Sequence, residues 1–466
     1  MTHVHFIGIG GSGLSAIARL LLESGYTVSG SDRALTLFAD EVRKAGATVY
    51  VGHHARNLAG ADWVVMSSAI GADNPEVQAA KQAKIPVYKR ADFLGELMSD
   101  KIGVAIAGTH GKTTTTAMTA WVLTDLKRDP SFIVGGVMKN LGVNARAGKG
   151  RLFVIEADEY DNMFLGLKPQ IEVVTNLEHD HPDFFPTFEA MVASFEKFTD
   201  LLPADGTLIA CAEDAGAAGL IQQVRKAGKN VIAYGMQNEL TISAPSWVLA
   251  RDVKANKRGG FDFVASSNIK SKSAGIDSVE VSLQMPGEHN VRNALAVLAV
   301  VDVLGLSREK AAKALGKFTG TGRRFELRGE VNGISIFDDY AHHPTEIKAT
   351  LAGARVRYPK RRIWAVLQPH TYSRTQALYL EFARAFKDAD EVIVTEVYAA
   401  REPKQDFTSA EIVSGMPHHS ARFIATLDQV TNHLLTHLRP DDVMIVLSAG
   451  DADQICTDVL KALKER

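Results

Sequence analysis

The stretch from residue 102 to residue 116 constrains the fold more than any other part of the sequence. Its apolar run Val104–Ala107 indicates a buried parallel strand, because strands covered on both faces are almost wholly apolar. Gly108 and Gly111 then mark a turn, and the apolar pattern from Lys112 to about Leu126 indicates a helix. A glycine turn that opens a helix directs backbone N–H groups and the positive end of the helix dipole at one point. The stretch therefore predicts a site for a nucleoside triphosphate.

The side chains of this turn suit phosphate groups and a metal ion. Lys112 supplies a positive charge, and the hydroxyl of Thr113 can hold Mg²⁺. The run Thr113–Thr116 consists of poor helix formers, so a ligand explains it better than local stability does. The general P-loop pattern has a glycine where this chain has Ile106, which leaves an ordinary glycine turn as the alternative. The candidate phosphate-binding residues are Gly108, Thr109, His110, Gly111, Lys112, Thr113 and Thr114.

The composition indicates an ordinary globular protein with more than one domain. A chain of 466 residues exceeds a single core. Its net charge of −2 gives no reason to expect nucleic acid or a membrane surface as a partner. Cys211 and Cys456 are too few for a disulfide framework or a zinc cluster. The sequence contains neither a transmembrane-length apolar run nor a signal-peptide pattern. We therefore expect a cytoplasmic protein, either a monomer or a homodimer.

Residues 3–32 indicate a second nucleotide-type site. The apolar strand Val4–Ile9 leads into a G-x-G-x-x-G turn and then an apolar helix. Asp32 follows the glycines by about 20 residues, where a Rossmann unit places the acid that binds a ribose. The alternative is a tight turn whose glycines only permit close packing. A further strand ends in two serines at the same crevice, so the candidate residues are Gly10, Gly11, Ser12, Gly13, Asp32, Ser67 and Ser68.

Two apolar strands of the central region lead into loops rich in carboxylates and histidines. Leu152–Ile155 precedes E-A-D-E-Y-D, which begins at Glu156, and Ile171–Thr175 precedes N-L-E-H-D-H, which ends at His181. The carboxyl ends of parallel strands share one edge of a sheet, the edge that also carries the phosphate loop. Carboxylates at that edge suit Mg²⁺, and His181 lies where a ligand or an orienting group is needed. The alternative is a pair of solvated loops.

Asn290 and Asn293 lie one helical turn apart at the start of an apolar helix that ends near Leu304. An asparagine amide offers a donor and an acceptor together, as an adenine edge requires. The alternative is a simple helix cap. Residues 237–280, which contain few long apolar runs, indicate strands and loops at the edge of the domain.

The chain from about residue 319 indicates a third α/β unit. Its first residues, 319–325, are expected to form a flexible basic linker from which Arg324 reaches a nucleotide in the preceding domain. The predicted strands 334–337 and 363–367 each end in a polar run, and predicted strands 391–395 and 443–447 complete the sheet. The second run contains His370 and Arg374, groups that suit an anionic substrate. Helix capping is the alternative. The expected fold is α/β in three domains: a Rossmann-like domain (1–99), a central domain with a P-loop ATPase-like parallel sheet (100–318) and a C-terminal Rossmann-like domain (319–466).

Several motifs together resemble those of the Mur ligase family. In chain order they are G-T-H-G-K-T-T, E-A-D-E, N-L-E-H-D-H, G-E-H-N-V-R-N, G-R-R-F, D-D-Y-A-H-H-P-T-E-I and Q-P-H-T-Y-S-R-T. The resemblance implies an ATP-dependent amide ligase of peptidoglycan synthesis. ATP phosphorylates the lactyl carboxylate of UDP-N-acetylmuramate, and the amine of L-alanine attacks the resulting acyl phosphate. The first domain then binds the UDP-sugar, the second binds ATP, and the third binds the amino acid.

The resemblance also implies roles for single residues. Lys112 and the amides of 108–114 hold the ATP phosphates, and Arg324 contacts a phosphate. Asn290 and Asn293 lie where adenine binds. The implied Mg²⁺ ligands are Thr113, Glu156 and His181. His370 and Arg374 hold the muramyl carboxylate, whereas the N-terminal glycines and Asp32 serve the UDP group. The implied catalytic residues are Lys112, Glu156, His181 and Arg374.

One residue departs from the pattern of the L-alanine-adding enzyme. Tyr160 stands where that enzyme usually has serine, and it resembles instead a recycling ligase that attaches a murein tripeptide to the same sugar. The stretch from Gln368 to Thr375 favours L-alanine. Lys197 is the nearest match to a lysine that some family members carbamylate. Two other classes stay open, a nicotinamide-dependent oxidoreductase that uses residues 3–32 and a non-catalytic P-loop regulator.

Overall fold

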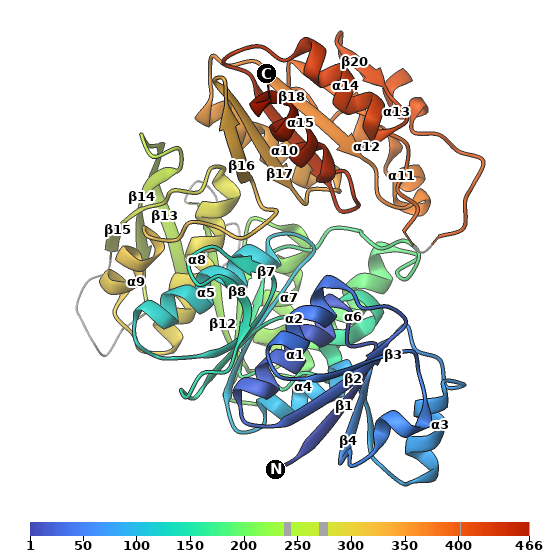
Figure 1. Ribbon diagram of the computed structural model, residues 1–466. Coiled ribbons are helices and arrows are strands. Elements are labelled where there is room, and N and C mark those ends of the chain that lie inside the picture. Colours follow the sequence, from blue (N-terminus) through green and yellow to red (C-terminus); the bar gives the residue numbers. More distant parts are fainter. Residues whose placement is uncertain (237–243, 270–277, 401, 466) are drawn as a thin grey trace.

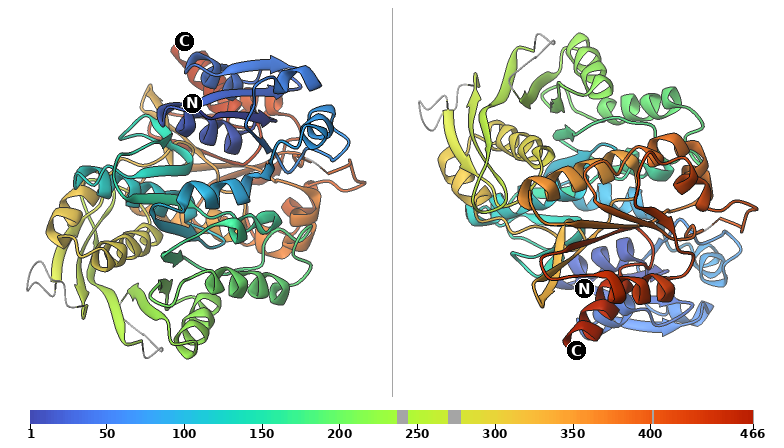
Figure 2. Two further views of the ribbon diagram at one scale, coloured as in Figure 1. Left: turned by 90° about the horizontal axis from the view of Figure 1, so that it is seen from below. Right: turned by 90° about the horizontal axis from the view of Figure 1, so that it is seen from above.

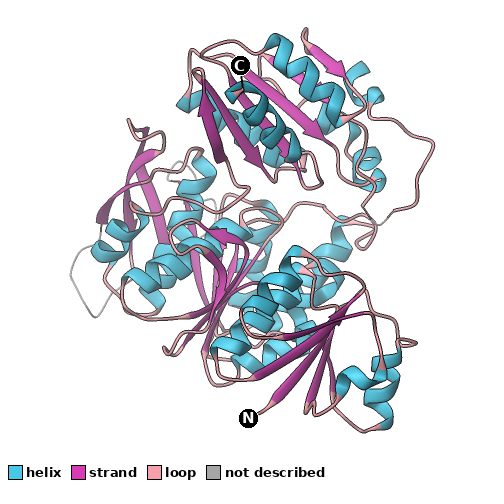
Figure 3. Cartoon of the chain, in the orientation of Figure 1, coloured by secondary structure: helices cyan, strands magenta, loops and turns pink. Residues whose placement is uncertain are grey.

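The computed structural model describes residues 1–236, 244–269, 278–400 and 402–465, with Ser12 described without its side chain. Within these ranges the chain forms three sheets, each flanked by helices (Figure 1, Figure 3). They correspond to the α/β class predicted from the sequence. None of the helices in the described residues combines the length and the apolar character that crossing a bilayer requires.

The first sheet is parallel and has the strand order β3-β2-β1-β4-β5. Its strands are β1 (His3–Ile7), β2 (Thr27–Asp32), β3 (Thr48–Val51), β4 (Trp63–Met66) and β5 (Val87–Lys89). Its helices are α1 (Ser12–Glu23), α2 (Leu37–Lys44), η1 (Ala55–Leu58), α3 (Pro75–Gln82) and α4 (Arg90–Met98). The strand order reverses between β1 and β4, and ligands of open α/β sheets bind at the carboxyl edge of such a point. The glycine turn after β1 and the serines after β4 both lie at this edge.

The central sheet has the strand order β15-β14-β13-β12-β11-β10-β6-β9-β7-β8. Its strands are β6 (Ile102–Ala107), β7 (Ser131–Met138), β8 (Val143–Arg146), β9 (Leu152–Glu156), β10 (Ile171–Val174), β11 (Thr207–Cys211), β12 (Asn230–Met236), β13 (Ser246–Ala255), β14 (Phe261–Ser267) and β15 (Ser278–Ser282). Its helices are α5 (Lys112–Asp125), η2 (Tyr160–Gly166), α6 (Phe188–Asp200), α7 (Ala215–Lys226), α8 (Glu288–Val303) and α9 (Arg308–Leu315). Strand β6 lies between β9 and β10, so the loops that follow these three strands are neighbours at one edge.

This sheet is mixed and not wholly parallel as predicted. The strands from β13 to β7 run parallel, whereas β8, β14 and β15 are antiparallel to their neighbours. The connections explain the difference: β7–β8 and β13–β14 are joined by short turns, and a parallel pair needs a crossover of a dozen or more residues. The predicted edge strands within 237–280 are β13, β14 and the start of β15, and residues 237–243 and 270–277 lie outside the described residues. Figure 2 shows these edge strands lying away from the other two sheets.

The third sheet has the strand order β16-β17-β21-β18-β19-β20. Its strands are β16 (Glu326–Val331), β17 (Ile334–Asp339), β18 (Ile363–Gln368), β19 (Glu391–Val394), β20 (Ala421–Phe423) and β21 (Val443–Ser448). Its helices are α10 (Pro344–Arg357), α11 (Tyr372–Ala377), α12 (Tyr379–Ala383), α13 (Ala410–Ser414), α14 (Leu427–His437) and α15 (Gln454–Lys464). The sequence predicted the four inner strands, and the outer strands β16 and β20 are additions to that prediction.

The clusters of buried apolar side chains join the N-terminal and central units and leave the C-terminal unit separate. Side chains of the N-terminal unit, such as Phe93 on α4, belong to the same cluster as central residues such as Phe164 and Phe195. The C-terminal sheet has its own two clusters, and every described member of both lies at or after Phe325. The C-terminal unit therefore meets the rest of the chain through polar contacts, and these contacts form the site.

The connection into the C-terminal unit is anchored, although the sequence predicted a flexible linker. Thr321 forms an isolated bridge with Met138, and the N–H of Gly322 donates to the carbonyl of Val137 at 2.8 Å. The Nε atom of Arg323 donates to Asp338 at 3.1 Å. The backbone groups of the linker are thus paired with the edge of the central sheet, which gives Arg324 a defined starting point.

Candidate active site

The loop between β6 and α5 has the backbone of a phosphate-binding turn. Gly108 and Gly111 have φ values of +129° and +81°. A Cβ atom at Gly108 would lie 2.1 Å from Thr175 Oγ1, and one at Gly111 would lie 2.9 Å from Asn293 Oδ1. The N–H groups of Thr109 and His110 already donate to Asn176, so they shape the loop from behind. The N-terminus of α5 therefore provides the donors that point into the site.

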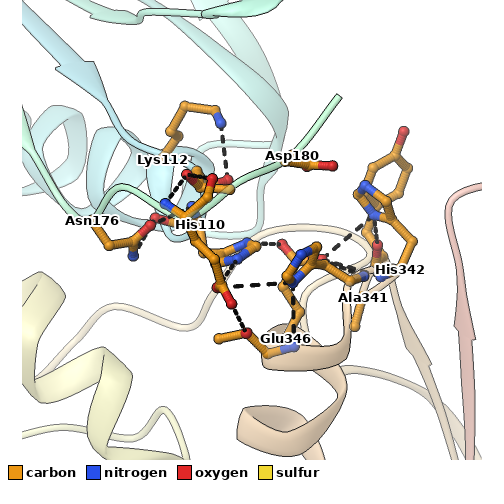
Figure 4. Close-up of polar contacts among 12 residues, drawn as sticks. His110, Lys112, Asn176, Asp180, Ala341, His342 and Glu346 are labelled. Carbon is orange, nitrogen blue, oxygen red and sulfur yellow. Dashed lines mark hydrogen bonds and ion pairs between the residues drawn. The ribbon is translucent and has the colours of Figure 1, made fainter. Parts of the chain in front are cut away.

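Lys112 is the first residue of α5 and is held inside the loop. Its Nζ atom donates to the carbonyls of Gly108 at 2.6 Å and Thr109 at 3.1 Å, and to Glu159 Oε1 at 2.8 Å (Figure 4). Burial raises the pKa of Glu159 to about 7, although Lys112 opposes the shift. Burial lowers the pKa of Lys112, but Glu159 outweighs it and the net shift is upward. The ammonium group is therefore charged and preoriented for an anion.

Thr113 and Glu156 fit a Mg²⁺ site. Thr113 Oγ1 lies 2.8 Å from Glu156 Oε1, and Glu156 Oε2 accepts the N–H of Gly135 at 2.6 Å. Two hard oxygen donors thus meet beside the phosphate loop, which is the ligand chemistry that Mg²⁺ prefers. Of the other threonines in this turn, Thr114 lines the neighbouring cavity, and the hydroxyl of Thr116 donates to the carbonyl of Lys112. Only part of the threonine run therefore faces the site.

His181, the third predicted Mg²⁺ ligand, lies close to Glu159. Its Nε2 atom is 3.8 Å from Glu159 Oε1 and 3.8 Å from Asp180 Oδ2. Burial lowers the pKa of His181, and a neutral imidazole can bind a metal.

Lys197, the nearest match to the lysine that some family members carbamylate, lies exposed in the last turn of α6.

A cavity opens between the phosphate loop, α8 and α10, and it encloses about 920 Å³ counting its open mouth. The two predicted adenine residues line it, and Asn293 Nδ2 donates to Asn290 Oδ1 at 3.1 Å. Tyr234 and Met285 add apolar surface from the central unit, while the C-terminal unit contributes the opposite wall. Apolar walls with a few fixed amides suit a purine base. The full lining is His110, Gly111, Thr114, Thr175, Asn176, Tyr234, Met285, Pro286, His289, Asn290, Arg292, Asn293, Arg324, Phe325, Asp339, Thr345, Glu346, Ala349, Thr350 and Gly353.

Arg324 crosses from the linker to the phosphate loop. Its Nη2 atom donates to Thr113 Oγ1 at 3.4 Å, and its Nη1 atom lies 3.7 Å from Glu346 Oε1. The guanidinium carbon lies 5.3 Å from the centre of the Tyr340 ring. The structure thus brings a cation of the C-terminal unit to the predicted metal site.

The imidazole of His110 bridges two carboxylates from different parts of the chain. Its Nε2 atom lies 3.0 Å from Glu178 Oε2, and its Nδ1 atom lies 3.3 Å from Glu346 Oε1. Burial opposes protonation, but these carboxylates outweigh it and raise the pKa of His110 to about 9. His343 lies against the same imidazole, with 4.6 Å between the ring centres. The side chain of His110 thus joins the central and C-terminal units, because its two ring nitrogens face Glu178 and Glu346.

Arg374 is buried against the central unit. Its Nε atom donates to Asp180 Oδ1 at 2.7 Å, and its Nη1 atom lies 3.2 Å from His370 Nδ1. The sequence placed His370 and Arg374 at one anion site, and the structure brings the two side chains together.

The N-terminal candidates meet at one turn. Asp32 Oδ2 accepts the N–H of Gly10 at 2.8 Å, which ties the turn to β2. A Cβ atom at Gly8 would lie 3.1 Å from that of Ser67, so β4 also reaches this turn, while Ser68 is exposed. Gly11 is the N-cap of α1, and Gly13 lies in its first turn under Arg90. The side chain of Ser12 lies outside the described residues.

Several titratable residues of the site were not among the predicted ones. They are Arg90, Glu159, Glu178, Asp180, His343 and Glu346. All except Arg90 lie inside the quoted motifs, and His343 and Glu346 have the N-cap and N3 spacing of a capping box, which they form. Arg90 Nη2 lies 3.5 Å from Asp158 Oδ2 and links the N-terminal unit to the loop after β9. No local pattern marked that contact.

Models of three Mur ligase domains match successive parts of the chain. The Mur ligase family catalytic domain matches residues 3–102, the Mur ligase middle domain matches 106–301, and the Mur ligase glutamate ligase domain matches 323–450.

Full-length relatives agree with these matches. The UDP-N-acetylmuramate–L-alanine ligase of Geobacter sp. (strain M21) is 42% identical over 465 residues, which cover 99% of this chain and 97% of that protein. The crystal structure of the UDP-N-acetylmuramate–alanine ligase from Thermotoga maritima has a TM-score of 0.80 at 28% identity and covers all of both chains. A murein peptide ligase from Psychrobacter arcticus 273-4 has a TM-score of 0.71 at 27% identity and covers 100% of this chain and 99% of that one. The chain belongs to the Mur ligase family.

Proposed function

We propose that this chain is an ATP-dependent ligase that joins L-alanine to the carboxylate of UDP-N-acetylmuramate in peptidoglycan synthesis. The observation that carries the proposal is the full-length similarity to the Geobacter ligase of that activity. The geometry supports it, because the phosphate loop borders a cavity that suits a purine base, and Arg374, which lies beside His370, contacts Asp180 in the loop after β10. ATP is the cosubstrate, and we propose the cytoplasm as the compartment.

ATP is proposed to bind with its phosphates at the N-terminus of α5 and its adenine in the cavity that Asn290 and Asn293 line. Lys112 and Arg324 supply positive charge from opposite units. Thr113, Glu156 and His181 are the proposed Mg²⁺ ligands. When bound there, Mg²⁺ neutralises phosphate charge and orients the transferred group.

The proposed reaction has two steps. A carboxylate oxygen of the sugar attacks the γ-phosphorus of ATP, and ADP leaves. The amine of L-alanine then attacks the acyl carbon, loses a proton, and inorganic phosphate leaves as the amide forms. The residues named above act by positioning and by charge neutralisation, which dominate catalysis of phosphoryl transfer.

The UDP-sugar is proposed to extend from the N-terminal turn to the C-terminal unit. Gly10, Gly11, Gly13, Asp32 and the two serines after β4 are the proposed contacts for UDP. His370 and Arg374 are the proposed contacts for the muramyl carboxylate at the far end of the cleft. This arrangement assigns residues 1–99 to the UDP-sugar, 100–318 to ATP and 319–466 to the amino-acid substrate.

Tyr160 bears on the choice of amine. Its hydroxyl donates to Asp183 at 3.0 Å, and its ring centre lies 5.0 Å from that of His181. The structural similarity to a murein peptide ligase keeps a tripeptide as the second candidate amine. The higher identity to the L-alanine ligase favours L-alanine. Neither alternative class is favoured. An oxidoreductase leaves the residues from 108 to 181 without a use, and a non-catalytic P-loop regulator needs no acidic and histidine clusters beyond one Mg²⁺ ligand.

The decisive assay measures phosphate release with ATP, Mg²⁺ and UDP-N-acetylmuramate, with L-alanine or an L-Ala-γ-D-Glu-containing tripeptide added separately. Release with L-alanine alone is the expected result. Release only with the tripeptide would assign the chain to peptide recycling. Titration with NADH, followed by fluorescence, tests the oxidoreductase hypothesis independently.

A further inference from the structure

Glu346 occupies a point where three parts of the chain meet. It is the third residue of α10, and its Oε2 atom accepts the N–H groups of His342 at 3.1 Å and His343 at 3.4 Å. Its Oε1 atom lies 3.3 Å from His110 Nδ1 (Figure 4). The same oxygen lies 3.7 Å from Arg324 Nη1. One carboxylate therefore caps a helix with one oxygen and contacts two cations with the other.

His110 and Arg324 each connect Glu346 to the phosphate loop. His110 is part of the loop and is held on its other side by Glu178. Arg324 reaches Thr113 Oγ1, which in turn contacts Glu156. The C-terminal unit thus influences the predicted metal site through a continuous set of contacts that begins at Glu346.

Arg324 needs a partner that orients its guanidinium group. An arginine side chain has many rotamers, and a guanidinium assists phosphoryl transfer only when it is already oriented toward the charge that develops. The Tyr340 ring restrains the position of the guanidinium group, and the negative charge of Glu346, 3.7 Å from Nη1, favours one orientation of it over the others. Burial opposes ionisation of Glu346, yet His342, His110 and Arg324 hold the pKa of this carboxyl well below its usual range, so it is charged.

We propose that Glu346 is a positioning residue for phosphoryl transfer, which holds Arg324 where its guanidinium group reaches Thr113 of the phosphate loop. The inference rests on the proposed function, because it assigns Arg324 to the ATP phosphates. Glu346 also lines the cavity assigned to adenine, but its proposed effect on phosphoryl transfer passes through Arg324.

A helix cap alone would explain the backbone contacts of Glu346, and the substitution Glu346→Gln separates the two roles. A glutamine at N3 still accepts backbone N–H groups, but it removes the charge that holds Arg324. The experiment is a double-variant cycle of wild type, Glu346→Gln, Arg324→Met and the combination, with kcat and KM for ATP measured at saturating sugar and L-alanine. Thermal unfolding of each variant verifies the fold.

In the wild-type background we expect Glu346→Gln to lower kcat by about 10-fold or more while KM for ATP changes by less than about 3-fold. In the Arg324→Met background we expect a further loss of less than about 2-fold. An equal loss in both backgrounds, or no loss in the first, would overturn the inference.

Two matched variants sharpen the result. Glu178→Gln removes the other carboxylate of His110 and leaves the contact between Glu346 and Arg324, so its loss of kcat is expected to be less than that of Glu346→Gln. Asp442→Asn breaks a buried pair with Arg362 at the amino end of β21 and is expected to leave kcat unchanged. If Asp442→Asn lowers kcat as much as Glu346→Gln does, general destabilisation explains the loss and the inference fails.

Failure of the proposed function has a different signature. In that case the wild type releases no phosphate with either amine, and the same cycle is read on binding of ATP with Mg²⁺ by calorimetry. Non-additive loss of affinity then supports the positioning role, and additive loss rejects it.

Discussion

Arg374 and Asp180 form a buried ion pair between the C-terminal and central units, with 2.7 Å between Nε and Oδ1 and side-chain exposures of 3% and 5%. Burial favours the neutral acid, but Arg374 outweighs it and holds the pKa of Asp180 well below its usual range. Removing one member of such a pair leaves the other charge buried without a partner. Arg374 therefore has a structural partner in addition to its proposed substrate.

These two roles can be separated. Arg374→Met is expected to destabilise the fold by about 3 kcal/mol, because Asp180 remains buried and charged. The variant Arg374→Met with Asp180→Asn should recover part of the thermal unfolding midpoint but none of the affinity for UDP-N-acetylmuramate. Calorimetric titration measures that affinity, and ATP binding should persist in both variants. Unchanged affinity for the sugar would remove Arg374 from the substrate site.

Lys112→Ala should abolish ADP formation. The ammonium group lies inside the phosphate loop, and losing a preorganised charge at the transferred phosphate lowers the rate by about 10³-fold or more. A coupled assay for ADP measures the loss. Lys168→Ala, which removes an exposed ion pair with Glu96, is the matched control and should change the rate by less than about 2-fold. Retained turnover in Lys112→Ala would refute the assignment of the phosphate loop.

The Mg²⁺ dependence of ADP formation should change when Glu156 is substituted. Chelation by EDTA is expected to stop ADP formation, and Glu156→Gln should raise the Mg²⁺ concentration for half-maximal rate by about 10-fold or more, since an amide oxygen is a weaker ligand for a hard cation than a carboxylate. Asp125→Asn, at the other end of α5, should leave that concentration unchanged. An unaltered Mg²⁺ dependence in Glu156→Gln would exclude this residue as a ligand.

His110 should make stability depend on pH. Its pKa is raised from 6.5 to about 9 by Glu178 and Glu346, against the effect of burial, so protonation favours the folded state. The contribution, at most about 3 kcal/mol, is complete below about pH 6.5 and is lost as pH rises through about 9. The difference in unfolding midpoint between wild type and His110→Gln should therefore shrink from pH 6 to pH 10. A difference independent of pH would show that His110 is not protonated in the folded protein.

The titratable groups that face this imidazole are Glu178, Glu346 and His343, and burial and His110 lower the pKa of His343. Glu178→Gln removes one of the two carboxylates and should move the pH at which stability is lost toward 6.5. A variant remote from the site, such as Asp125→Asn, should keep the wild-type pH dependence.

Predictions from local sequence patterns agree with the structure where the conformation depends only on neighbouring residues in the chain. The strand and helix around Gly108 and Gly111 follow from apolar periodicity and two glycines, and both lie at positive φ. The meeting of the loops after β6, β9 and β10 follows from the rule that parallel strands share a carboxyl edge. The antiparallel edges of the central sheet were missed, because the lengths of the connecting turns and not the strand sequences decide them.

The sequence by itself determined the three α/β units, the phosphate loop and the family, because motifs and periodicities are properties of contiguous residues. Only the tertiary structure decided which charges meet. Arg324 with Thr113, His110 with Glu346 and Arg374 with Asp180 are pairs far apart in the chain, and each forms because the C-terminal unit docks against the loops of the central unit. The side chains of these residues show no local preference for one another. Their pairing depends on the distance and the low polarity that docking creates, and neither quantity is encoded in a window of sequence.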